Sequence, residues 1–138
     1  MHIEDCINYL LTGAQHKVFQ TMKKALEPYD LTPIQYGVLA CVWQKEMCNP
    51  KEIAEFLSIE NSTISGILER MEGKDLLLRE IDSNDRRYIR IVLTDKSRKL
   101  EKPVLKTVAD VNKELLKTFS DADEDKLRVL LRSIISLP

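Results

Sequence analysis

Apolar residues recur three or four positions apart near the start of the chain, from Ile3 through Leu26. This spacing continues for about seven turns and therefore predicts one long amphipathic helix, which Pro28 ends. A second helix is predicted to begin after Thr32, which has the spacing of a capping box with Gln35. The stripe on the first helix is longer than one small domain covers, so we expect part of it to pack against another chain.

The stretch 49–94 has a different pattern, with two short amphipathic segments followed by two alternating ones. Asn49 can cap the first short helix, and the second is predicted to begin at Glu60 or Asn61. The second segment has a single apolar stripe, formed by Ile64, Ile67, Leu68 and Met71. Two short helices joined by a tight turn predict a helix-turn-helix unit.

The opposite face of the second short helix is small and hydroxylic in its first turns and basic further along. The candidate DNA-binding residues on this helix are Asn61, Ser62, Thr63, Ser65, Gly66 and Arg70. Small side chains allow a helix to approach base edges closely, and its N-terminal amides attract phosphate. The pattern therefore predicts a recognition helix.

Two alternating strands follow, and the polar turn 82–87 joins them. Ile91 and its alternate neighbours are predicted to form a half-buried strand, with Arg90 on its other face. Arg86 and Arg87 lie in the turn, where guanidinium groups can enter the negative potential of a minor groove. We expect Asp85 to orient one of these arginines. The predicted DNA-binding set therefore includes Arg86, Arg87 and Arg90.

Helical spacing returns after the second strand. It predicts a helix over 95–119 with Pro103 in its first turns or at a kink, and a last helix that Ser120 begins. Both helices have apolar stripes that a lone winged helix would leave exposed. A homodimer interface built from residues 1–15 and 105–138 is the simplest way to bury them.

Four short segments resemble parts of the MarR-type transcriptional regulators. Residues 85–87, Asp-Arg-Arg, and residues 93–94, Leu-Thr, are similar to the wing signature of that family, and residues 31–36 and 68–72 are similar to its second and recognition helices. The resemblance implies a winged-helix homodimer that binds a pseudo-palindromic operator on double-stranded DNA. It also implies a repressor that is relieved by a small molecule or an oxidant.

Length and composition agree with one globular domain. The chain has 138 residues, of which 43% are hydrophobic and 31% charged. The expected fold is mainly α: a winged helix-turn-helix lobe over 30–99 with a small β-hairpin wing, flanked by dimerisation helices over 1–29 and 100–138. No apolar run has the length of a membrane span, and no basic region precedes an apolar one at the start. We therefore expect a cytoplasmic protein with no membrane partner, and its three cysteines to be reduced thiols.

The net charge is −1, which is unusual for a DNA-binding protein. Its distribution is more favourable, since residues 61–99 carry nine basic and seven acidic side chains, or +2, against −3 for the remainder. Nonspecific attraction to DNA should therefore be modest. We expect affinity to depend on dimerisation and on well-placed contacts.

Catalysis is not predicted. The chain has no nucleophile elbow, phosphate-binding loop or dinucleotide-binding glycine motif. His2 and Cys6 have helical i, i+4 spacing, but no further pair of metal ligands accompanies them. We expect neither a metal nor a cofactor.

The signal that the protein senses is left open by the sequence. The main expectation is a small-molecule effector whose chemistry the sequence does not identify. An alternative is thiol-based redox sensing by Cys6, because a helix N-terminus favours the thiolate and some MarR-type regulators sense peroxides with a cysteine in this helix. A second alternative is a winged helix that docks a protein in place of DNA.

Overall fold

The structure, a computed structural model, describes all 138 residues as a mainly helical chain with one antiparallel hairpin. Its elements are η1 (Ile3–Asp5), α1 (Ile7–Leu26), η2 (Glu27–Tyr29), α2 (Pro33–Lys45), α3 (Pro50–Phe56), α4 (Asn61–Gly73), β1 (Leu77–Ile81), β2 (Ile89–Leu93), α5 (Asp95–Leu115) and α6 (Asp121–Ile135). The predicted fold class, a winged helix-turn-helix with long flanking helices, is confirmed. No helix is both long and apolar enough to cross a membrane.

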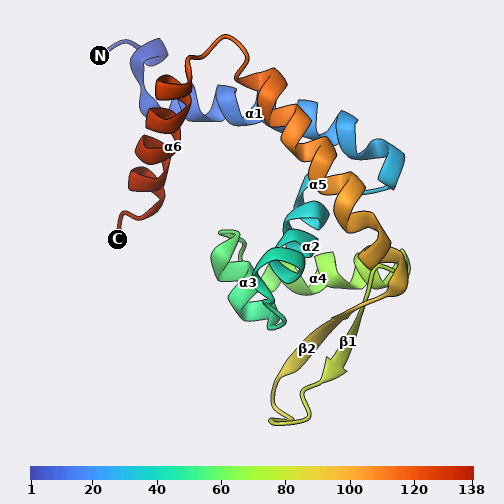
Figure 1. The fold of residues 1–138 in the computed structure, drawn as a ribbon. Coiled ribbons are helices and arrows are strands. Elements are labelled where there is room, and N and C mark those ends of the chain that lie inside the picture. Colours follow the sequence, from blue (N-terminus) through green and yellow to red (C-terminus); the bar gives the residue numbers. More distant parts are fainter.

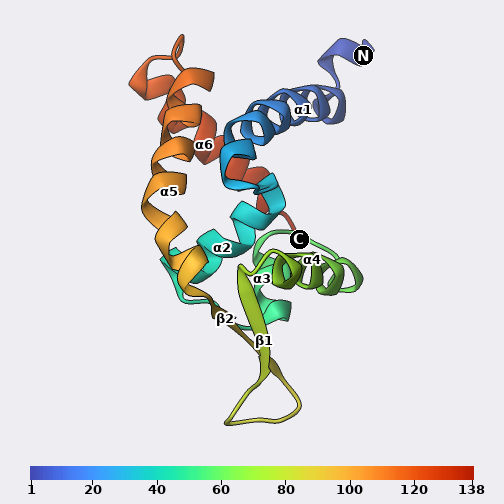
Figure 2. The same cartoon turned by 90° about the vertical axis from the view of Figure 1, so that its right-hand side faces the viewer.

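One hydrophobic core joins α2, α3, α4 and the hairpin to the first half of α5 and the end of α1. Its buried side chains include Leu26, Val38, Leu39, Ile53, Ile64, Leu68, Met71, Leu77, Ile91 and Val104. Figures 1 and 2 show α1 and α5 leading away from this lobe, with the hairpin projecting at the opposite end. The core therefore holds α4 and the hairpin in a fixed relation to the two long helices.

The hairpin is only partly covered by the core. Ile91 and Leu93 on β2 are buried, and the backbone amide of Ile91 donates to the carbonyl of Cys48 at 2.8 Å. Ile89 was predicted to lie on the buried face of the strand, but its side chain is 46% exposed. Its cross-strand partner Ile81 is 69% exposed. The reason is that this end of the hairpin extends beyond the hydrophobic core.

The start of the chain differs from the expected continuous helix. Ile3 lies in the 3-10 turn η1, Cys6 has an extended backbone, and α1 begins at Ile7. Ile3 is 67% exposed and contacts no core, so no packing energy is available to extend α1 by another turn. The prediction that His2 and Cys6 lie on one helix is therefore wrong. No cluster of three or more candidate metal ligands exists in the chain.

The terminal helices expose apolar surface. α6 has no buried residue, and Figure 1 shows it at the end of the molecule away from the hairpin. The exposed apolar side chains on α1 and α6 include Ile7, Leu10, Leu11, Val18, Leu130, Ile134 and Ile135. A patch of this kind is typical of a surface that another chain covers.

Candidate nucleic-acid interface

The recognition-helix candidate, α4, has one buried face and one exposed face. Its buried residues are the four that the sequence pattern predicted, Ile64, Ile67, Leu68 and Met71. A tight turn precedes it, and Ser58 in this turn has a left-handed backbone with φ of 56°. Three other helix junctions also contain a left-handed residue, and the four φ values lie between 54° and 58°. The core therefore fixes which face of α4 points outward.

The outward face of α4 contains the predicted residues. Asn61, Ser62, Thr63 and Ser65 are exposed, and Gly66 is half-buried. The side chain of Glu60 does not cap the helix, so the amides of Asn61 and Ser62 have no acceptor within the chain. Free amides and hydroxyl groups at a helix N-terminus are well suited to bind phosphate oxygens and base edges.

Arg70 extends this face toward the end of α4. It is exposed and forms no ion pair with any acidic side chain. Its guanidinium lies back along the helix over Gly66, and a methyl group added to Gly66 would lie 3.5 Å from Nη1 of Arg70. The free guanidinium of Arg70 thus lies close to Gly66 and beside the hydroxylic residues.

Asp85 and Arg87 organise the turn of the hairpin. Both Nε and Nη2 of Arg87 donate to the Asp85 carboxylate, at 3.0 and 2.8 Å, and the Arg87 amide donates to the same carboxylate at 3.1 Å. These hydrogen bonds hold the pKa of Asp85 below its usual value and raise the pKa of Arg87. The prediction that Asp85 orients one arginine is confirmed.

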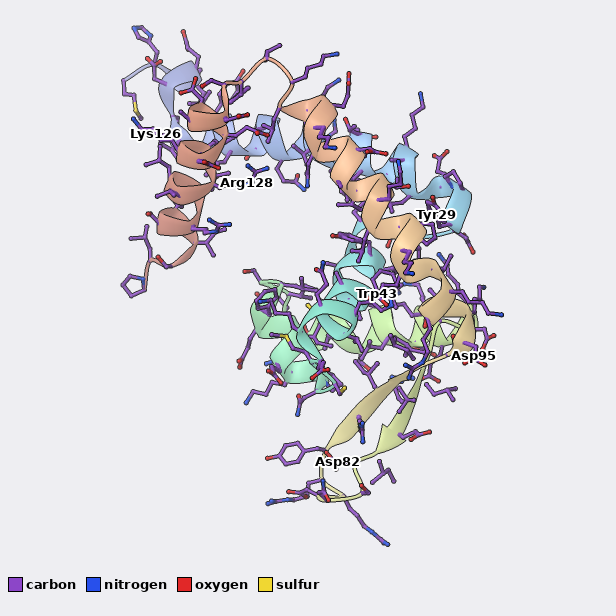
Figure 3. The ribbon with its side chains drawn as sticks, viewed as in Figure 1. Tyr29, Trp43, Asp82, Asp95, Lys126 and Arg128 are labelled. Atoms are coloured by element: carbon purple, nitrogen blue, oxygen red, sulfur yellow. The ribbon has the colours of Figure 1, made fainter.

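The rest of the turn is held by local contacts. The amide of Asp82 donates to the carbonyl of Tyr88 at 2.9 Å, and the Asp82 carboxylate accepts from the amide of Asn84 at 2.8 Å. The guanidinium carbon of Arg87 lies 5.8 Å from the centre of the Tyr88 ring. Figure 3 shows Asp82 near the free end of the hairpin and Asp95 where the hairpin meets α5. Tyr88 was not among the residues predicted to bind DNA, although its position beside Arg87 is a signal that could have identified it.

The other two arginines of the wing have different surroundings. Arg86 is exposed at the tip and has no ion-pair partner. Arg90 lies opposite Glu80 in the hairpin and lines a hollow of about 340 Å³ with Asn49 and Glu52 from the start of α3. The structure therefore groups Arg86 and Arg87 at the tip and places Arg90 apart from them, nearer to α3.

The three cysteines do not share one site. Cys6 is half-buried directly before α1, and Figure 1 shows the start of α1 away from α4 and the hairpin. Cys41 is buried in α2, and burial raises the pKa of its thiol. Cys48 is half-buried, and its Sγ donates to the carbonyl of Glu46 at 3.6 Å. No disulfide links them.

Together these features define a class of protein. A helix-turn-helix whose second helix exposes small polar residues, followed by a hairpin with arginines at its tip, is the architecture of winged-helix DNA-binding proteins.

Comparison with known proteins narrows this class. The model of the MarR family matches residues 31–89. The HTH-type transcriptional regulator MgrA of Staphylococcus aureus is 30% identical over 132 residues, which cover 95% of this chain and 86% of that relative. The chain belongs to the MarR family and is a DNA-binding transcriptional regulator, not an enzyme.

Solved structures agree with this assignment. The transcriptional repressor CouR bound to a 23-mer DNA duplex is 29% identical, with a TM-score of 0.85 over 96% of this chain and 94% of that one. CouR from Rhodococcus jostii RHA1 bound to p-coumaroyl-CoA is 26% identical, with a TM-score of 0.84 over 100% of this chain and 97% of that one. The chain is thus similar to one regulator in a DNA-bound and a ligand-bound form.

Proposed function

We propose that this regulator is a homodimeric repressor, which binds a pseudo-palindromic operator and is released from it by a small-molecule effector. The observation that carries the proposal is the exposed face of α4, where small and hydroxylic residues surround free helix amides beside an arginine-tipped wing. Repression is supported by the likeness to CouR, which is itself a repressor.

On this proposal each protomer places α4 in a major groove, and the two grooves lie about one helical turn, or ~10 bp, apart. Ser62, Thr63 and Ser65 would contact bases or phosphates, with Asn61 at the start of the helix. Gly66 would allow close approach. Arg70 would bind the DNA backbone, Arg86 and Arg87 would enter the minor groove, and Arg90 would contact the backbone nearer to α3.

Dimerisation is supported by the apolar surface on the terminal helices. Residues 1–15 and 105–138 contain the exposed side chains of α1 and α6 that no part of the same chain covers. Burying such side chains against a second copy contributes about 25 cal/mol for each Å² of apolar surface removed from water. The lobe over 30–99 would then read DNA while the remaining helices, 1–29 and 100–138, hold the two copies together.

The effector is proposed to act through the separation of the two lobes. Because both half-sites must be bound together, a ligand that changes the distance between the two α4 helices weakens binding without touching DNA. The complex of CouR with p-coumaroyl-CoA supports a small-molecule effector in this family.

The test begins with selection of bound fragments from a random duplex library, followed by affinity measurements over a range of salt concentrations. We expect a pseudo-palindromic site, a dimer in sedimentation, and an affinity that falls steeply as salt rises. A monomer that binds no duplex would contradict the proposal. Specific binding of a protein partner without DNA binding would favour the docking alternative.

Redox sensing by Cys6 has a separate test. Cys6 is a free, half-buried thiol directly before α1, so oxidation there would act on a terminal helix and not on α4. If Cys6 is the sensor, peroxide releases the wild-type protein from the selected operator and does not release a Cys6→Ser variant. Release of both proteins would exclude Cys6.

A further inference from the structure

We propose that Lys74 is a positioning residue for operator binding, which holds the end of α4 against the start of α2. The inference rests on the proposed function, in which α4 reads the major groove. Lys74 directly follows Gly73, the last residue of α4, and its side chain is 27% exposed.

The side chain of Lys74 binds the junction between α1 and α2. Its ammonium donates to the carbonyl of Asp30 at 2.8 Å and to Oε1 of Gln35 at 2.9 Å, and it lies 3.6 Å from the Asp30 carboxylate. Gln35 is buried, and its Oε1 also accepts from the amide of Thr32 in the capping box of α2. One acceptor of Lys74 is therefore a buried side chain that is itself held by the capping box of α2.

The backbone at the same point is bound from the other side, by the start of α5. Nζ of Lys96 donates to the carbonyl of Lys74 at 2.7 Å, and Oγ1 of Thr94 donates to the carbonyl of Asp75 at 2.7 Å. Thr94 is also the cap of α5. Hydrogen bonds thus join the end of α4 to the segment that leads into α2 and to the start of α5.

These contacts act together with the buried face of α4 in fixing the direction of the helix. The helix has 13 residues and spans about 20 Å, so a tilt of about 3° at its end moves its first turn by about 1 Å. Contacts to base edges tolerate displacements of only about 0.5 Å. Lys74 can therefore influence base readout at Ser62 without approaching DNA, since its ammonium is already bound to protein acceptors.

The test compares Lys74→Met with Lys102→Met. Methionine keeps the aliphatic stem of Lys74 and removes the ammonium, and Lys102 is an exposed lysine of α5 with no ion pair. Both variants are titrated, by fluorescence anisotropy over a salt series, with the operator selected as above and with a scrambled duplex of equal length. The melting temperature of each variant confirms that it is folded at the assay temperature.

We expect Lys74→Met to bind the operator about tenfold more weakly, the effect of losing hydrogen bonds from a charged donor. Affinity for the scrambled duplex and the slope of log K against log[salt] should not change, because those depend on phosphate contacts. Lys102→Met should match the wild type in all three measurements. The expected result is therefore a loss of specificity and not of general DNA affinity.

Two results would overturn the inference. One is an unchanged operator affinity. The other is a parallel loss on both duplexes with a slope smaller by about 0.9, which would make Lys74 a phosphate contact. If Lys74→Met does not fold, Lys96→Met removes the opposite contact and should give the same loss of specificity. A wild-type protein that binds no duplex would refute the proposed function itself, and the inference with it.

Discussion

Replacing Gly66 by alanine should stabilise the fold and weaken operator binding. Gly66 lies inside α4 with no positive φ, where alanine is favoured over glycine by about 1 kcal/mol. The added methyl group would meet only the Arg70 guanidinium, at 3.5 and 3.9 Å, so no clash reduces this gain. For a domain of this size, about 1 kcal/mol raises the melting temperature by about 3–5 °C.

The same methyl group lies on the face that is proposed to meet DNA. Ser62 precedes Gly66 by four residues and Arg70 follows it by four, so all three lie along one side of the helix. Added volume in a closely packed interface costs about 1–3 kcal/mol. Since about 1.4 kcal/mol is a factor of ten, operator binding should weaken about tenfold.

Thermal unfolding followed by circular dichroism measures the first effect, and anisotropy titration with the selected operator measures the second. Gly73→Ala is the matched control, because a methyl group at the far end of α4 would meet nothing within 4 Å. That variant should keep the wild-type Kd. If Gly66→Ala bound the operator as tightly as the wild type, α4 would not approach DNA through this face. A lower melting temperature would refute the helix argument.

Three further predictions concern the wing and the dimer. Arg86→Gln and Arg87→Gln should each flatten the salt dependence of operator binding, by about 0.9 in the log–log slope for each lost phosphate contact; unchanged binding in both variants would refute the wing assignment. The pKa of Asp85 should lie below its ordinary value of 3.8 in an NMR titration, and rise toward that value in Arg87→Gln. The order that this ion pair gives the wing should therefore be present above pH 3.8 and be lost only as the pH falls through the lowered pKa. Leu10→Glu places a charge in the exposed apolar surface of α1, so sedimentation should find a folded monomer; an unweakened dimer would exclude this interface.

Features that depend on neighbouring residues were predictable from the sequence. The caps of α2, α5 and α6 each accept a hydrogen bond from the third residue that follows, at 3.2, 3.2 and 3.1 Å. The buried stripe of α4 follows from its helical spacing, and the contact of Asp85 with Arg87 spans only two residues. In each case the interacting groups are brought together by local backbone geometry, which the sequence pattern specifies.

Features that depend on distant segments were decided by the tertiary structure. Lys74 binds Gln35 and Asp30, which are 39 and 44 residues away, and no periodicity in the sequence indicates that pairing. Ile89 continues the apolar alternation of its strand, yet it is exposed because the hairpin extends past the core. The sequence by itself therefore determined the order of the helices, their capped starts, the hairpin and the outward face of α4, but not where α1 begins. Packing decided which helix ends contact each other and which residues the core covers. Those contacts form only when elements that are distant in the sequence pack together.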